Sequence, residues 1–94
     1  MKKSIACIED RIKKLITKRL RQGVDIRKIS RDTSLIGKGL GLDSIALQEL
    51  VVGLEEEFGI FIDESELRIE FFENIGSLAN FISKELNSNE TTEK

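Results

Sequence analysis

The chain has 94 residues, 39% hydrophobic and 34% charged, with no histidine, proline, tryptophan or tyrosine and with Cys7 as its one cysteine. This length suits one small domain, and the lack of histidine excludes Cys/His zinc sites and nucleophilic pairs of serine or cysteine with histidine. The net charge of −2 hides an asymmetry: residues 1–31 hold 11 Lys/Arg and 3 Asp/Glu, whereas residues 32–94 hold 4 and 14.

Apolar segments are short throughout the chain. None approaches the roughly 18 residues that span a bilayer, and the run from Ile5 to Ile8 is too short for a signal peptide. We therefore expect a cytoplasmic protein without stable membrane insertion. Cys7 lies within that apolar run, which favours its interpretation as a small buried hydrophobic residue.

The first predicted helix runs from about Ser4, a plausible N-cap, to Gln22, with Gly23 as a C-terminal stop. Its apolar residues recur at steps of three and four: Ile5, Ile8, Ile12, Leu15 and Ile16. Its basic residues fall largely on the other faces: Lys13, Lys14, Lys18, Arg19 and Arg21. Such a basic surface has two interpretations, a solvated face that partly neutralises the acidic half, or a face for nucleic acid or membrane.

A long loop follows over residues 24–43, where helical periodicity fades and three glycines alternate with other residues between 37 and 41. Structureless loops of this length are uncommon in compact domains and tend to be functional. We expect an ordered loop, pinned to the core by Leu35, Ile36, Leu40 and Leu42.

The second predicted helix runs from Ser44 to Phe58, with Asp43 or Ser44 as the N-cap and Gly59 as the stop. At about 100° per residue, one buried stripe collects Leu47, Leu50, Val51, Leu54 and Phe58.

The rest of the chain predicts one short helical turn within residues 62–71 and a last helix that opens at Glu73 or Asn74. The core face of that helix is Ile75, Leu78, Phe81, Ile82 and Leu86. Residues 87–94 have no apolar side chain and are expected to form a disordered tail after a domain of residues 1–86. The predicted fold is all-α, a small irregular bundle of three longer helices and one short one.

Opposite the buried stripe, the second helix turns Ile45, Glu49, Val52 and Glu56 outward. This set is either an ordinary solvated face with two exposed aliphatic residues, or a docking strip for a basic, partly apolar partner. Gly53 costs about 1 kcal/mol relative to alanine inside a helix, and its position would permit close approach by another backbone.

Ser44 begins this same helix. On spacing alone its role is either to cap the helix or to carry a phosphodiester, whose negative charge the free N–H groups and the positive end of the helix dipole would favour.

Three segments carry a family resemblance, and their spacing matches without a gap: Gly41-Leu42-Asp43-Ser44-Ile45, Glu49-Leu50-Val51 and residues 54–60. They resemble the Asp-Ser-Leu motif and second helix of acyl carrier proteins. The likeness continues more weakly through Ile62-Asp63 and residues 75–82.

This resemblance implies that Ser44 carries a 4'-phosphopantetheine arm, transferred from coenzyme A by a phosphopantetheinyl transferase that uses Mg²⁺ only during the transfer. Asp43 would assist recognition or metal placement. The protein would be a carrier without catalytic residues or a resident metal, a monomer that holds acyl groups as thioesters. The resemblance also implies that Ile45, Glu49, Val52 and Glu56 recognise partner enzymes, and that Leu47, Leu50 and Leu54 line the acyl pocket.

Three departures from the family pattern point to a specialised carrier of fatty-acid, polyketide-like or envelope-lipid synthesis. Ala46 replaces the usual acid, Asp63 replaces the usual proline, and the first helix is unusually basic. A peptidyl carrier protein is the nearest alternative, although that family tends to have histidine where this chain has Asp43. A nucleic-acid or membrane-binding protein built on the basic first helix is the alternative of a different class, and the chain offers no stacking aromatics to support it.

Overall fold

The computed structural model describes residues 4–20 and 23–92, and it describes all their side chains except those of Glu64 and residues 88–92. Three α-helices form the body: α1 (Ile5–Arg19), α2 (Ser44–Phe58) and α3 (Ile75–Thr92). Three 3-10 turns lie between them: η1 (Ile26–Lys28), η2 (Glu64–Glu66) and η3 (Ile69–Phe72). The described residues contain no strand, so the all-α prediction is confirmed, and the single short helix expected after α2 is two separate turns. None of the described helices is long and apolar enough to cross a membrane.

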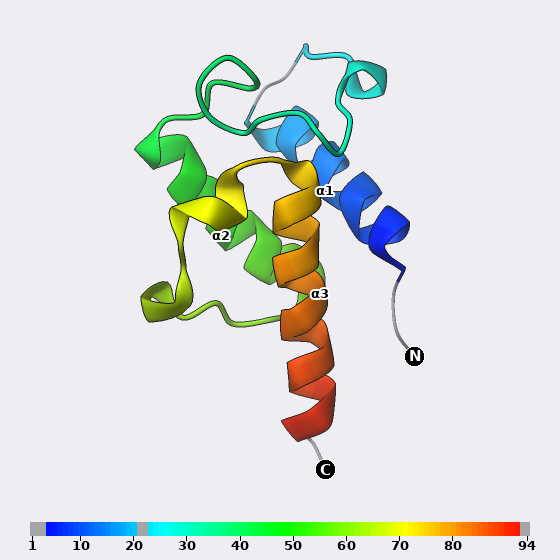
Figure 1. Ribbon diagram of the computed structural model, residues 1–94, viewed down its shortest axis with the longest axis vertical. Helices are drawn as coiled ribbons and strands as arrows, with labels where there is room; N and C mark the ends of the chain where they lie inside the picture. The colour runs from blue at the N-terminus through cyan, green and yellow to red at the C-terminus, as the bar shows by residue number, and fades with distance from the viewer. Residues whose placement is uncertain (1–3, 21–22, 93–94) are drawn as a thin grey trace.

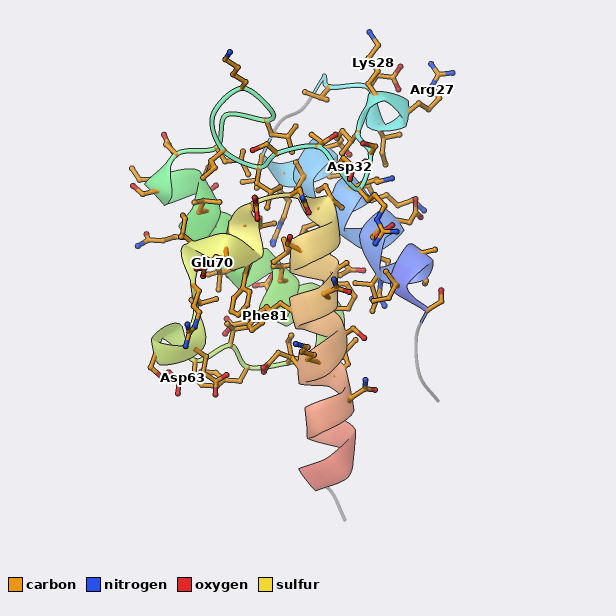
Figure 2. The ribbon with its side chains drawn as sticks, in the orientation of Figure 1. Arg27, Lys28, Asp32, Asp63, Glu70 and Phe81 are labelled. Carbon is orange, nitrogen blue, oxygen red and sulfur yellow. The ribbon has the colours of Figure 1, made fainter. Side chains whose placement is uncertain are left out.

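The helices pack around one core to which α1 and α3 contribute most (Figure 1). The predicted apolar face of α1 is buried at Ile8, Ile12, Leu15 and Ile16, and that of α3 at Ile75, Leu78, Phe81 and Ile82. Phe81, labelled in Figure 2, stacks on Phe71 of η3 with ring centroids 4.5 Å apart. The helical periodicity of the sequence therefore identifies the core-facing sides of both helices.

The start of α1 agrees with prediction, because the hydroxyl of Ser4 accepts a hydrogen bond from the Cys7 N–H at 3.1 Å. The helix ends earlier than expected, with Leu20 as its C-cap, and the expected end at Gln22 lies outside the described residues. The interpretation of Cys7 as a core residue is wrong, since its side chain is exposed. It precedes Ile8 by one residue, and about 100° of helical rotation carries it off the buried face.

The loop between α1 and α2 arches over the end of the molecule where α3 begins (Figure 1). Leu35 and Leu42 are buried, as expected, while Ile36 and Leu40 are partly buried. Two loop carbonyls accept the first N–H groups of α3: Thr33 O from Ile75 N at 3.2 Å, and Arg31 O from Gly76 N at 2.8 Å. Because a helix start leaves its first N–H groups without intrahelical partners, these bonds fix the loop to α3.

Arg31 also links this loop to α1. Its Nε lies 3.4 Å from Oε2 of Glu9, a carboxylate that is almost buried among the helices. The expectation of an ordered loop is thus confirmed by its contacts with α1 and with α3. The turn η1 inside the loop was not predicted; it begins where the Asp25 carboxylate accepts the Arg27 N–H at 2.9 Å.

The backbone of α3 continues past Leu86 to Thr92, which differs from the disordered tail expected over residues 87–94. Leu86 is the last apolar residue, and beyond it the helix propagates because each added residue gains one backbone hydrogen bond. Residues 93 and 94 lie outside the described residues. The boundary of the domain at Leu86 stays a prediction.

Candidate functional site

Ser44 is the first residue of α2, and its side chain is exposed. The cap of this helix is Asp43, whose Oδ1 accepts the Ala46 N–H at 2.8 Å. Asp43 O also accepts the Leu47 N–H at 2.9 Å. The residue that caps the helix is therefore Asp43 and not Ser44. No described residue forms a hydrogen bond with the Ser44 hydroxyl, which is open to solvent at the helix start.

The preceding loop fixes the position of this helix start. Leu42, next to Asp43, is buried, and its N–H donates to Leu35 O at 2.9 Å. Leu40 N donates to Ser34 O at 2.8 Å, and a Cβ at Gly39 would overlap that same Ser34 carbonyl group. The close approach at Gly39 explains one of the alternating glycines, and the two backbone hydrogen bonds anchor the loop one and three residues before Asp43.

The surroundings of Ser44 fit a phosphodiester. The N–H groups of Ser44 and Ile45 belong to the first turn of α2, and within the described structure neither has a hydrogen-bond partner. Helix N-termini of this kind favour anions through free N–H groups and the positive end of the dipole. In the part of the chain that the structure describes, no three Cys, Asp or Glu side chains gather where they could hold a metal ion.

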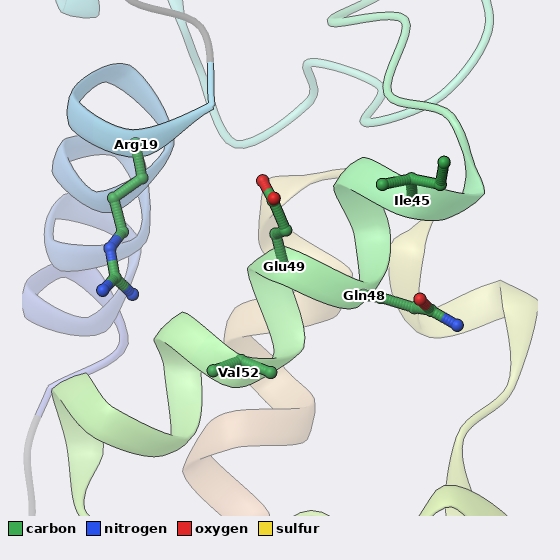
Figure 3. Close-up of a pocket in the computed structure, with 5 residues that line it drawn as sticks. All are labelled: Arg19, Ile45, Gln48, Glu49 and Val52. Atoms are coloured by element: carbon green, nitrogen blue, oxygen red, sulfur yellow. The ribbon is translucent and has the colours of Figure 1, made fainter.

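The outward face of α2 presents the residues that the helical geometry predicts (Figure 3). Ile45 is 68% exposed and Val52 51% exposed, and Glu49 and Glu56 are exposed as well. A groove of about 650 Å³ brings Ile45, Glu49 and Val52 together. Glu56 is not among the residues that line that groove, and its carboxylate pairs with a cation of α1.

That cation is Arg19, whose Nη2 lies 3.0 Å from Glu56 Oε1. A second pair joins Arg11 Nη2 to Glu57 Oε2 at 2.8 Å, and the Arg11 guanidinium lies over the Phe58 ring at 4.5 Å. The contact of Arg19 agrees with the interpretation of the basic face as one that partly neutralises the acidic half, and Arg11 adds a pair from outside the predicted face. Arg21, which was part of that face, lies outside the described residues.

Two of the three leucines expected to line an acyl pocket are core residues, and the third packs against the core. Leu50 and Leu54 are buried, and Leu47 is partly buried against the core. None of them lines the surface pockets described for this chain. A pocket of about 650 Å³ lies instead beside α2, where it is lined by residues that include Val51, Phe61, Ile62 and Leu67.

Phe61 is 77% exposed at this pocket, and the sequence reasoning did not single it out. No sequence pattern distinguished it, because residues 60–62 are all apolar, and the structure alone shows that Ile60 and Ile62 are buried while Phe61 faces outward. Alternation with a period of two is typical of an extended segment with one buried side.

Two carboxylates outside the start of α2 have shifted pKa values. The pKa of Asp63 is lowered, mainly because its carboxylate accepts the Ser65 N–H at 3.0 Å. The pKa of Glu85 on α3 is raised, first by burial and then by the negative charge of Glu66. Neither group lies at the start of α2, so these shifts do not bear on the Ser44 site.

Comparison with known proteins gives consistent matches. A family model described as "Phosphopantetheine attachment site" matches residues 10–82. The chain is 34% identical to an acyl carrier protein of Thermotoga maritima over 84% of this chain and 91% of the relative. It is 44% identical to an acyl carrier protein of Desulforapulum autotrophicum over 63% of this chain and 74% of the relative. Among solved structures it resembles a holo acyl carrier protein from Nitrosomonas europaea, with a TM-score of 0.75, 28% identity and coverage of 84% and 95% of the two chains.

Proposed function

The chain belongs to the acyl carrier protein family, and we propose that Ser44 is the residue to which its 4'-phosphopantetheine cofactor is attached. The observation that carries this proposal is that Asp43 and Ser44 have different roles at the start of α2. Asp43 caps the helix, which leaves the Ser44 hydroxyl without a partner among the described residues and beside two free N–H groups. The cofactor supplies a thiol that holds acyl groups as thioesters.

Asp43 has a second proposed role, in recognition or metal placement by the transferase. Its Oδ1 is engaged with the Ala46 N–H, while the residue as a whole is exposed. This hydrogen bond thus fixes the carboxylate of the residue that directly precedes Ser44. An enzyme that docks at the start of α2 would meet both groups together.

The proposed partner surface is the outward face of α2, hereafter the docking face, which consists of Ile45, Glu49, Val52 and Glu56. Exposed aliphatic residues between carboxylates suit a partner that is basic and partly apolar. Phosphopantetheinyl transferase and acyl-loading, elongating or acyl-transfer enzymes are the proposed partners.

We further propose Leu47, Leu50 and Leu54 as the apolar lining for an acyl chain. Their support is their place on the core-facing stripe of the helix that Ser44 begins. Because Leu50 and Leu54 are buried in the core, an acyl chain would have to displace neighbouring side chains to reach them.

The proposed setting is the cytoplasm, with the protein acting as a monomeric carrier. The pathway is fatty-acid, polyketide-like or envelope-lipid synthesis, and the departures at Ala46 and Asp63 together with the basic α1 favour a specialised branch. The ion pairs of Arg11 and Arg19 with α2 give those arginines a role inside the domain, which weakens the nucleic-acid and membrane alternatives.

Loading of Ser44 is tested by incubating the protein with coenzyme A, Mg²⁺ and a broad phosphopantetheinyl transferase and measuring its intact mass. The wild type should gain one phosphopantetheine, Ser44→Ala should gain none, and Ser65→Ala, which removes another exposed hydroxyl, should load like the wild type. Loading of Ser44→Ala, or failure of the wild type with several transferases, would overturn the assignment. Subsequent loading with fatty acyl groups rather than amino acids would separate an acyl carrier from a peptidyl carrier.

A further inference from the structure

The groove that includes Ile45, Glu49 and Val52 of the docking face is lined by residues of two helices. Four of its lining residues come from α2 (Ile45, Gln48, Glu49 and Val52) and the fifth, Arg19, comes from α1. Figure 3 shows the Arg19 side chain extending from α1 along the side of the groove opposite Glu49. The α2 side of the groove carries the acidic Glu49, and the α1 side carries the cation Arg19.

The position of Arg19 is specified on two sides. Its Nη2 donates to Glu56 Oε1 at 3.0 Å. Its Nη1 lies over the backbone of Gly53, where a Cβ would be only 2.9 Å away. The glycine inside α2 therefore makes room for this guanidinium, which is a second observation, independent of the ion pair, that Arg19 belongs against α2.

Arg19 retains capacity for another partner. Its side chain is 50% exposed, and Glu56 is the only described residue with which its guanidinium forms a hydrogen bond. A guanidinium has five N–H donors in a planar fork suited to carboxylates. The free donors are available on the rim of the groove, where an incoming side chain can reach them.

We propose, as a refinement that rests on the docking face above, that a partner enzyme presents an acidic side chain to Arg19 as well as a basic one to Glu49. Between these charges an apolar side chain of the partner packs against Ile45 and Val52. A uniformly basic partner surface would bring a cation against Arg19. Such a contact between like charges would disfavour the complex. Arg19 is thus a residue of partner specificity, supplied by the helix whose basic character sets this chain apart.

Reversing the charge at position 19 tests this proposal, because the proposal predicts a decrease in the partner's kcat/KM. The probe is whichever broad phosphopantetheinyl transferase loads the wild type fastest, with kcat/KM measured at low and high salt. Arg19→Glu should lower kcat/KM about 3- to 10-fold at low salt, and the deficit should shrink at high salt. Arg19→Gln, which avoids repulsion with Glu56, should lower it less. A uniformly basic partner gives the opposite sign, because added negative charge would speed its association.

The matched control is Arg27→Glu, which makes the same change of net charge on η1. Arg27 projects from η1 at the edge of the molecule (Figure 2), and its own pair is with Asp25. The Arg27→Glu variant should have a kcat/KM within about twofold of the wild type. Thermal melting by circular dichroism shows whether each variant is folded, and the Arg19→Gln result decides if Arg19→Glu is not.

The outcomes separate this inference from the proposed function. If Glu49→Lys slows loading while Arg19→Glu and Arg19→Gln do not, the docking face stands and the acidic contact with Arg19 is wrong. If none of these variants slows loading, the docking face itself fails, whereas the Ser44 assignment is judged separately from the mass of the loaded wild type.

Discussion

The Arg19 side chain of α1 lies against α2 at Gly53, where a Cβ would be 2.9 Å from the Arg19 Nη1 atom. The same Cβ would lie 3.1 and 3.2 Å from the two terminal methyl groups of Leu15. The guanidinium is the end of a flexible side chain and can move, but Leu15 is buried in the core. The absence of a side chain at position 53 therefore sets how closely α1 and α2 pack.

Gly53→Ala tests this packing. In an open helix the change gains about 1 kcal/mol, whereas overpacking a core costs about 1 to 3 kcal/mol. We expect a net loss of about 1 kcal/mol, measured by urea denaturation. In a Leu15→Ala background the crowding is removed and the same change should stabilise. Equal effects in both backgrounds would contradict the role assigned to the contact with Leu15.

Asp43 allows capping to be separated from recognition. Asp43→Ala removes the acceptor of the Ala46 N–H and should cost about 0.5 to 2 kcal/mol in unfolding free energy. Asp43→Asn keeps an oxygen at that place and should be nearly as stable as the wild type. If the carboxylate also takes part in transfer, Asp43→Asn will load coenzyme A's arm more slowly despite its stability. Wild-type loading of Asp43→Asn would limit Asp43 to the cap.

Leu54 lies at the centre of the buried stripe of α2, with 1% of its surface exposed. Leu54→Ala should lower the unfolding free energy by about 2 to 5 kcal/mol, as truncation of core leucines does. Val52→Ala, on the opposite side of the same helix, should change it by about 0.5 kcal/mol or less. Similar losses for the two variants in denaturant titrations would mean that the faces of α2 are assigned wrongly.

Glu85 makes stability depend on pH. Burial and the charge of Glu66 raise its pKa in the folded protein above the ordinary value of 4.5. The folded state then binds this proton more tightly than the unfolded chain, so the ionised carboxylate opposes folding above the raised pKa. That penalty fades as pH falls through the raised pKa, and it is gone below 4.5.

Glu85→Gln should consequently melt higher than the wild type at pH 7, with a difference that disappears once the pH is below 4.5. Melting temperatures across this range give the comparison. Glu70→Gln, which removes an exposed carboxylate on η3, is the control. An equal gain in both variants would assign the effect to total charge rather than to the surroundings of Glu85.

The sequence was most informative where the determinants of structure are local. Helix α2 was predicted with its observed bounds because Asp43 supplies a cap oxygen and Gly59 adopts a left-handed φ of 65° at the C-cap. Its buried stripe was predicted because the helical period places Leu50 and Leu54 on one face. The outward position of Ile45 and Val52 follows from the same geometry.

Contacts between distant segments were not predictable in this way. Arg19 and Glu56 are 37 positions apart, and their pairing depends on the rotation and crossing of two helices, which periodicity does not specify. The two interpretations of Ser44 also needed three-dimensional information, because only the hydrogen bond of Asp43 shows which residue caps the helix. Gly53 lies between these cases: its cost inside a helix indicated close approach by another backbone, whereas the nearest atoms belong to the side chains of Leu15 and Arg19.

The bonds from the loop to α3 have a consequence for hydrogen–deuterium exchange. Amide protons in the first turn of a helix usually exchange rapidly, since they face solvent, but those of Ile75 and Gly76 donate to Thr33 O and Arg31 O. These two protons can exchange only when the loop separates from α3. Their protection therefore reports the free energy of loop opening, and it shows how firmly the segment that leads to Ser44 is held, at sites remote from Ser44 in sequence.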